Sequence, residues 1–403
     1  MGNKIQMIEL SKEHNAIREE IEAAINKVID SSAFIHGAEV ELFERNLARY
    51  LNVKHVIGCA NGTDALQIAL MALDLKPGEQ VLVPAFTYVA TAEVIALLGL
   101  VPVMYDVNPR NFNTDSVSLE NIEEIITENT RAIVPVHLFG QCSDMNAVLA
   151  VAEKYNLKVV EDCAQALGAK CKVGQEEKFA GTIGNIGCTS FFPTKNLGGM
   201  GDGGALFTND DALAARIRMI ASHGQEKKYH HKVIGCNSRL DTIQAAVLNV
   251  KLKYLDSYLA KRRRAAALYT TLFTKADPLN KYFYTPLEED YSNHTYHQYT
   301  LIIKDKHSAV ETTEEGATRD ALKQHLADKG IASMIYYPLP LSDQEAFQNI
   351  ALKREDFSAT ATDSLHNSEY LAKHVLSLPM NPTILPEEIE FIVNEVINFL
   401  KEA

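Results

Sequence analysis

Short apolar runs alternate with segments of helical periodicity between about residues 55 and 160. The runs typical of buried strands are HVIGCA, QVLVPA, VPVMYDV, RAIVPVHLF and LKVVEDCA. Between them, the segments typical of helices are ALQIALMAL, VATAEVIALLG, SLENIEEIITE and MNAVLAVAEKY. Because parallel strands need crossover connections, this alternation predicts an α/β fold with a mainly parallel central sheet flanked by helices.

Helical patterns also precede and follow this region. Residues 11–52 contain two helical segments, and residues 239–273 form one long helical stretch without Pro or Gly that could join two lobes. After it, the pattern predicts strand (QYTLIIKD), helix (RDALKQHLADKG), strand (SMIYY) and a closing helix (PEEIEFIVNEVINFL). We therefore expect a large domain over residues 1–255 and a smaller α+β domain over residues 256–403.

Three polar stretches are expected at the surface. Residues 310–317 and 343–366 are polar and irregular, which is typical of insertions between elements. The run KRRR at 261–264 is expected to form a solvated helix face, because acidic residues are abundant nearby.

Composition and charge exclude several classes of protein. The chain has 403 residues with 52 acidic and 39 basic side chains, a formal net charge of −13, which argues against nucleic-acid binding. Its most apolar stretch, residues 94–104, is too short to span a membrane, and the N-terminus lacks the apolar segment of a signal peptide. The six cysteines are scattered without a C-x-x-C spacing, so we expect no disulfide framework and a reducing, cytoplasmic environment.

The segment NGTDALQ, residues 61–67, connects a predicted strand to a predicted helix. Gly62 permits a tight turn, after which the amides of Thr63 and Asp64 would point out of a helix N-terminus and could hold a phosphate. Asn, Thr and Asp are also preferred as helix caps, and on this segment alone the cap is the simpler interpretation.

Two ionisable residues lie in positions that favour chemistry. Asp162 stands at the carboxyl end of an apolar strand, where ligands bind in open α/β sheets, although it could equally cap the next helix. Lys195 lies in TSFFPTKNLGGMGDGG, an apolar and glycine-rich segment that would lower its pKa and free its amine for Schiff-base chemistry. The G-x-G-x-x-G match at Gly199, Gly201 and Gly204 precedes a strand-like segment, so it is not read as a dinucleotide fingerprint.

A set of short motifs resembles one known family. NGTDAL, PAFTYVAT, EDCAQALGA, TSFFPTKNLGG, GDGGALFTND and NSRLDTIQAAVL are similar, in this order, to segments of the DegT/DnrJ/EryC1/StrS family of pyridoxal-phosphate sugar aminotransferases. The resemblance spans the chain from about residue 35 to residue 382. It implies the fold-type I aminotransferase architecture and a homodimer whose active sites lie at the subunit interface.

The resemblance also assigns roles at the cofactor. It makes Lys195 the Schiff-base lysine and Asp162 the partner of the pyridinium nitrogen. It places Phe86 on the ring face, although a plain core residue would explain Phe86 as well, and it places Gln165 beside the ring. The resemblance matches four positions to contacts with the cofactor phosphate: Thr63, Asp64, Ser190 and Asn237. Asn237 would reach the phosphate from the neighbouring subunit.

The implied reaction is a transamination in two halves, in which glutamate gives its nitrogen and a keto-sugar nucleotide receives it. The motifs are most similar to the subgroup that acts on UDP-2-acetamido-2-deoxy-3-oxo-glucuronate for surface polysaccharides. The subgroup positions that contact the nucleotide sugar are Phe34, Thr194, Arg239, Tyr336 and Tyr337. Arg239 could instead pair with Asp241, and Tyr336 stands where histidine is common.

Other activities remain open at this stage. A 4-keto UDP-sugar or a dTDP-3-keto-6-deoxyhexose could be the acceptor, and a non-catalytic homologue that keeps the cofactor is a further alternative. No metal site is expected, because the pairs His230–His231 and His294–His297 lack a metal-binding context.

Overall fold

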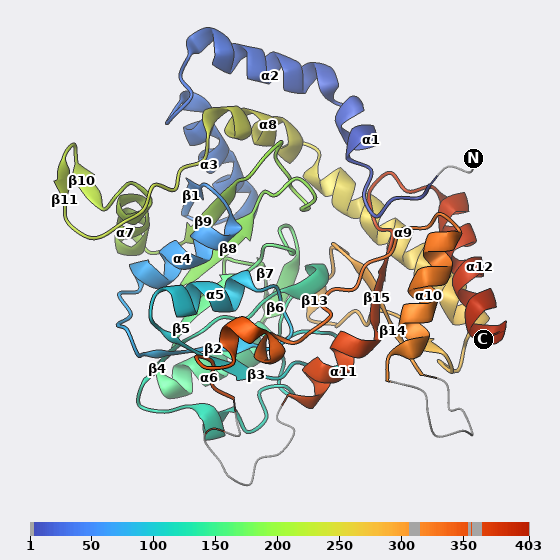
Figure 1. Cartoon of the computed structure of the whole chain (residues 1–403). Coiled ribbons are helices and arrows are strands. Elements are labelled where there is room, and N and C mark those ends of the chain that lie inside the picture. Colours follow the sequence, from blue (N-terminus) through green and yellow to red (C-terminus); the bar gives the residue numbers. More distant parts are fainter. Residues whose placement is uncertain (1–3, 306–314, 354–355, 357–364, 403) are drawn as a thin grey trace.

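The computed structural model describes residues 4–305, 315–353, 356 and 365–402, and its centre is a seven-stranded sheet (Figure 1). In spatial order the strands are β1 (His55–Cys59), β9 (Gly204–Thr208), β8 (Ile186–Ser190), β5 (Lys158–Asp162), β4 (Thr130–Ile133), β2 (Gln80–Pro84) and β3 (Val101–Tyr105). β9 runs antiparallel to both of its neighbours, whereas the pairs from β8 to β3 are parallel. The predicted mainly parallel α/β sheet is confirmed.

Helices cover both faces of this sheet. Along β2, Val81 and Val83 pack in one buried cluster and Leu82 in another, because successive side chains of a strand point to opposite faces. The helices on the Val81 side are α4 (Gly62–Ala72), α5 (Ala90–Leu97) and α7 (Asp211–Ala221). Those on the Leu82 side are α3 (Ala38–Leu51), α6 (Met145–Tyr155) and α8 (Thr242–Leu252).

The N-terminal region and the long helical stretch are each divided more finely than predicted. Residues 11–52 form three helices, α1 (Leu10–Asn15), α2 (Arg18–Ser31) and α3, and not the two that were predicted. The first predicted helix is interrupted between α1 and α2. The stretch 239–273 is broken at residues 253–254 into α8 and α9 (Leu255–Ala276). Figure 1 shows α2 lying along α8, where their apolar side chains form a small separate cluster.

Helix α9 contributes to two hydrophobic cores. Its first turns place Leu255 and Leu259 in the core beneath the sheet, whereas Tyr269 and Phe273 lie in the core of the C-terminal region. The predicted boundary at residue 255 falls where α9 begins. The elements of the C-terminal region are β12 (Phe283–Tyr284), β13 (Ser292–Asn293), β14 (Tyr299–Ile303), α10 (Ala317–Asp328), α11 (His366–His374), β15 (Val375–Leu378) and α12 (Pro386–Glu402). None of the helices in the described ranges is long and apolar enough to cross a membrane.

Two predicted elements do not form. SLENIEEIITE contains only a short 3-10 turn at Ile122–Ile125, because Asn121 before it adopts a left-handed conformation with φ of 61° that no helix tolerates. SMIYY forms no strand and is joined, among the described residues, only by a single bridge, between Met334 and Ser377, to β15 of the three-stranded sheet β12–β14–β15. The pattern also missed the hairpin of β6 (Lys170–Val173) and β7 (Glu176–Phe179).

The expected surface stretches are partly buried. Phe347 and Leu365, inside the stretch 343–366, belong to the core of the large domain, while residues 354–355 and 357–364 lie outside the described residues. Most of the stretch 310–317 also lies outside them. Arg262, expected on a solvated face, is only 3% exposed and donates hydrogen bonds to the carbonyl oxygens of Tyr296, His297 and Met380. Three backbone carbonyls accept hydrogen bonds from this cation, and the charge of the buried Glu13 carboxylate also favours it.

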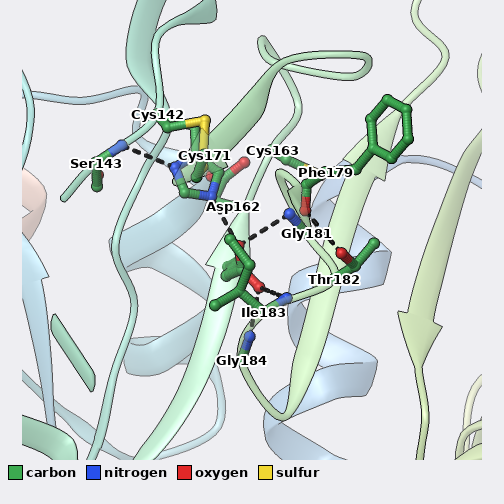
Figure 2. Close-up of polar contacts among 12 residues, drawn as sticks. Cys142, Ser143, Asp162, Cys163, Cys171, Phe179, Gly181, Thr182, Ile183 and Gly184 are labelled. Carbon is green, nitrogen blue, oxygen red and sulfur yellow. Dashed lines mark hydrogen bonds and ion pairs between the residues drawn. A yellow bond between two sulfur atoms is a disulfide. The ribbon is translucent and has the colours of Figure 1, made fainter. Parts of the chain in front are cut away.

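The absence of disulfides was predicted wrongly. Cys142 and Cys171 form a disulfide with their Cα atoms 6.1 Å apart, which Figure 2 shows beside Ser143. The two cysteines are 29 residues apart in the chain, and only the packing of β6 against the loop after β4 brings them together. The remaining four cysteines are free.

Candidate functional site

A cavity of about 490 Å³ opens at the carboxyl ends of the central strands. The end of β5, the end of β8 and the N-terminus of α4 form its floor, and residues 297–298 and 336–337 of the C-terminal region close one side. The predicted site residues that line it are Thr63, Asp162, Gln165, Ser190, Thr194, Lys195, Tyr336 and Tyr337. The fold thus gathers most of the predicted site from segments that are far apart in the sequence.

Lys195 lies in the turn that follows β8, where its amide donates to the carbonyl oxygen of Phe192. Burial lowers the pKa of its amine to about 8, although the Asp162 carboxylate acts in the opposite direction. A lysine with this pKa is substantially neutral just above pH 8, and a neutral amine is a nucleophile. This agrees with the prediction that an apolar environment lowers the pKa of Lys195 and frees its amine for Schiff-base chemistry.

Asp162 ends β5 with its side chain 6% exposed. The hydroxyl of Thr91, on α5, donates to one carboxylate oxygen at 2.9 Å, and the amide of Ala164 donates to the other at 3.1 Å. A carboxylate can accept about four hydrogen bonds. Since Asp162 also lines the cavity, its remaining acceptor capacity is available to a bound cation or donor.

The N-terminus of α4 has features of both interpretations of the segment NGTDALQ, a helix cap and a phosphate site. The side chain of Asn61 caps the helix by accepting a hydrogen bond from the Asp64 amide at 2.8 Å, so this predicted phosphate contact is already used. The amides of the first turn have no acceptor within a helix, and Gly62, Thr63 and Ser190 line the cavity there. The geometry is that of an anion site at a capped helix end.

A methyl group at residue 62 should weaken phosphate binding. A Cβ atom on Gly62 would lie 2.7 Å from the Cβ of Ser190, so Gly62→Ala must displace the strand end that carries the Ser190 hydroxyl. We expect the dissociation constant for pyridoxal phosphate to rise about tenfold, in line with the usual cost of overpacking. Titration calorimetry on the variant checks this, and an unchanged dissociation constant would refute the phosphate cradle.

Gln165 joins the two sides of the cavity. Its carbonyl oxygen accepts from the Phe139 amide at 2.8 Å, and its amide donates to the hydroxyl of Tyr337 at 3.0 Å. Phe86, predicted to stack on the cofactor, is 1% exposed and packs its ring edge-on against Tyr337 with centroids 6.1 Å apart. Phe86 does not line the cavity in this single chain, whereas Tyr88 does. Stacking by Phe86 stays a prediction.

Three predicted residues lie away from the cavity. Phe34 is 44% exposed, and Asn237 is exposed beside a backbone bridge to Ser222. Arg239 lines a separate cavity of about 200 Å³. The alternative partner Asp241 makes no ion pair with Arg239 within the described part of the chain, so the arginine is not neutralised there.

His297 lines the cavity, where the sequence suggested a loop or substrate-rim histidine in preference to a metal ligand. No group of three or more potential ligand residues that could hold a metal ion is found among the described residues. Burial lowers the pKa of His297 well below its usual value, and the charges of Lys195 and Arg262 act in the same direction. Its buried Nδ1 atom finds no hydrogen-bond partner among the described residues. An unsatisfied polar atom in this wall is consistent with a ligand that completes it.

The arrangement fits a cofactor that carries an aldehyde, a basic ring nitrogen and a phosphate. Lys195 supplies the amine, Asp162 the carboxylate, and the α4 N-terminus with Ser190 the anion site. Gln165 and His297 add hydrogen-bonding groups along the wall between them.

Comparison with known proteins gives one consistent result. Residues 15–397 match the DegT/DnrJ/EryC1/StrS aminotransferase family. The pleiotropic regulatory protein of Geobacillus stearothermophilus is 42% identical over 98% of this chain and 99% of its own length. The UDP-2-acetamido-2-deoxy-3-oxo-D-glucuronate aminotransferase of Pseudomonas aeruginosa is 40% identical, over 98% and 100%. The dTDP-3-amino-3,6-dideoxy-alpha-D-galactopyranose transaminase of Aneurinibacillus thermoaerophilus is 38% identical, over 97% and 98%.

A solved structure agrees. The crystal structure of a DegT DnrJ EryC1 StrS aminotransferase from Brucella abortus superposes with a TM-score of 0.87 at 38% identity, covering 98% of this chain and 99% of that one. The predicted aminotransferase architecture is therefore confirmed, and the family depends on pyridoxal phosphate. The chain belongs to the DegT/DnrJ/EryC1/StrS aminotransferase family and is a sugar aminotransferase that acts on keto-sugar nucleotides.

Proposed function

We propose that this enzyme aminates the C3 ketone of UDP-2-acetamido-2-deoxy-3-oxo-glucuronate, with glutamate as donor, for surface polysaccharide synthesis. The observation that carries the chemistry is the gathering of Lys195, Asp162 and Gln165 in one cavity above a helix N-terminus. The full-length similarity to the Pseudomonas aeruginosa enzyme supports this acceptor. Because residues 15–397 match an aminotransferase family, an enzyme is favoured over a non-catalytic homologue.

Each residue of the cavity then has a defined task. Pyridoxal phosphate, when bound, supplies an aldehyde for covalent attachment to an amine and a ring that withdraws electrons. Lys195 would provide the amine, and after its release this amine would act as the base and then the acid of the 1,3-proton shift, taking the proton from the substrate carbon that bears the nitrogen. Asp162 provides the negative charge that favours a protonated ring nitrogen. Thr63 and Ser190 provide donors to the phosphate.

A homodimer and a cytoplasmic location belong to the same proposal. Phe34, Asn237 and Arg239 do not line the cavity of their own chain, and Phe34 and Asn237 are exposed. The segments are held together, since the amide of Thr242 donates to the carbonyl of Phe34 at 3.0 Å. This supports the proposal that they complete the cavity of a second copy, with Asn237 on the phosphate.

Arg239 should select for the acidic sugar. If its guanidinium meets the substrate carboxylate, Arg239→Gln should raise KM for the uronate about tenfold or more, because charge-assisted hydrogen bonds contribute about 1.5–3 kcal/mol. KM for a neutral keto sugar should stay unchanged. The matched control is Arg218→Gln, since Arg218 lines the same smaller cavity but is paired with Glu44 at 2.8 Å.

The assay uses glutamate with a panel of keto-sugar nucleotides, including a 4-keto UDP-sugar and a dTDP-3-keto-6-deoxyhexose. The dTDP-sugar is the second candidate, which the relative from Aneurinibacillus thermoaerophilus supports. A preference for the neutral 6-deoxy sugar, with no difference between the Arg239 and Arg218 variants, would overturn the uronate proposal.

A further inference from the structure

A carboxylate with no exposure to solvent lies directly behind the cavity. Glu161 precedes Asp162 on β5, so the two side chains point to opposite faces of the sheet. The Glu161 carboxylate accepts hydrogen bonds from the amides of Gly181 at 2.9 Å, Ile183 at 2.7 Å and Gly184 at 2.6 Å. Figure 2 labels the three residues that carry these amides, which all lie in the loop before β8.

A buried histidine supplies the fourth hydrogen bond. His137 Nε2 lies 2.9 Å from the Glu161 carboxylate, and both side chains are fully buried. The amide of Ser143 donates to His137 Nδ1 at 3.0 Å. Because Nδ1 accepts, Nε2 is the ring nitrogen that donates to the carboxylate. The Glu161 carboxylate thus accepts four hydrogen bonds, two on each oxygen.

The same backbone segment holds the cavity residues. The amide of His137 donates to the carbonyl of Asp162 at 2.9 Å, and the amide of Asp162 donates to the carbonyl of Pro135 at 3.0 Å. Two residues further on, the Phe139 amide holds the side chain of Gln165. Movement of residues 135–139 would therefore displace both groups that are assigned to the cofactor ring.

The loop before β8 is equally constrained. Gly181 adopts φ of 86°, and a Cβ atom there would lie 2.8 Å from the sulfur of Cys163. A Cβ on Gly184 would lie 2.8 Å from Val159 on β5. This loop leads into the start of β8, so Glu161 joins the carboxyl ends of β4 and β5 to the loop before β8.

We propose that Glu161 and His137 are positioning residues for transamination, which hold Asp162 and Gln165 in place by joining the ends of β4 and β5 to the loop before β8 through one buried carboxylate. The inference rests on the proposed role of Asp162. In Glu161→Gln, the amide group must face a backbone N–H of the loop before β8, so this loop or the end of β5 moves. A displacement of about 1 Å at a reacting group can reduce a rate about 100-fold.

The C-terminal region offers a matched control. Asp305 accepts hydrogen bonds from the amides of Gly316 at 2.7 Å and Thr318 at 3.3 Å, and its carboxylate lies 3.1 Å from His374 Nε2. This carboxylate–imidazole pair resembles the first, but it lies against β14 and α10, away from the cavity residues. Asp305→Asn therefore reports what the loss of such a pair does to stability alone.

The experiment compares Glu161→Gln with Asp305→Asn in the protein loaded with pyridoxal phosphate. We expect both to lower Tm. Only Glu161→Gln should lower kcat, by about 100-fold with KM for the sugar unchanged, raise the dissociation constant for pyridoxal phosphate, and shift the pH titration of the visible absorbance. Equal effects of the two variants on these three readouts would overturn the inference.

If Glu161→Gln does not fold, His137→Gln gives the same test, because it keeps an N–H donor toward Glu161 but changes the acceptor of the Ser143 amide. It should lower kcat relative to Asp305→Asn, and a kcat equal to that of the control would refute the positioning role. If Asp162→Asn leaves kcat unchanged, the proposed role of Asp162 fails. If Asp162→Asn lowers kcat and the Glu161 and His137 variants do not, only this inference fails.

Discussion

Replacing Lys195 with alanine should abolish transamination. The loss removes both the amine that attaches the cofactor and the base that moves the proton, so we expect kcat to fall by at least about 10⁴-fold. The reason is local, since burial in the turn after β8 lowers the pKa of this lysine to about 8 and makes the neutral amine available. Borohydride reduction of the loaded wild-type protein, followed by peptide mass spectrometry, should place the pyridoxal label on Lys195.

Lys251 is the control for this substitution. It is 3% exposed, and burial lowers its pKa too, although Glu13 opposes the shift. Lys251→Met should leave the label and kcat intact, because Lys251 does not line the cavity. A pyridoxal label on another lysine, or turnover retained by Lys195→Ala, would disprove the assignment.

Replacing Asp162 with asparagine should depress kcat by about 10²–10³-fold, which is typical for the loss of one electrostatic contact at a reacting group. Asparagine keeps the shape and can still accept the hydrogen bond from Thr91, but it cannot balance a positive charge on the ring nitrogen. Steady-state kinetics and the pH titration of the visible absorbance measure the change.

Asp305→Asn serves again as the reference, because it removes a partly buried carboxylate outside the cavity. If Asp162→Asn and Asp305→Asn turn over at equal rates, charge at residue 162 is not needed for the reaction.

The alternation of apolar runs and helical patterns along the sequence was sufficient to predict the central sheet and the helices that flank it. Helix α6, Met145–Tyr155, coincides with the predicted segment MNAVLAVAEKY, and the predicted strands around it form. Both faces of this sheet are covered, so its strands need continuous apolar side chains, which are visible in any window of the sequence. The segment SLENIEEIITE has the same apparent periodicity, but one left-handed residue, Asn121, stops the helix.

The contacts of buried polar side chains were far harder to predict from the sequence. Arg262 reads as part of a basic surface run, yet it is buried because three carbonyl oxygens from distant segments satisfy it. In the sequence, Glu161 is only a second acidic residue beside Asp162. The folded structure places three backbone amides and His137 in hydrogen-bonding contact with its carboxylate. The disulfide between Cys142 and Cys171 likewise depends on contact across the fold.

The sequence by itself determined the α/β class and pointed to Lys195 and Asp162 as candidate site residues, because these depend on residue type, on the strand that each residue follows and on the motifs around them. Only the tertiary structure decided which polar groups from distant segments are buried together: the carbonyl oxygens around Arg262, and the three amides and His137 around the carboxylate behind Asp162. The physical reason is that apolar burial follows a local period, whereas the partners that a buried polar group needs come from segments that only the fold brings together.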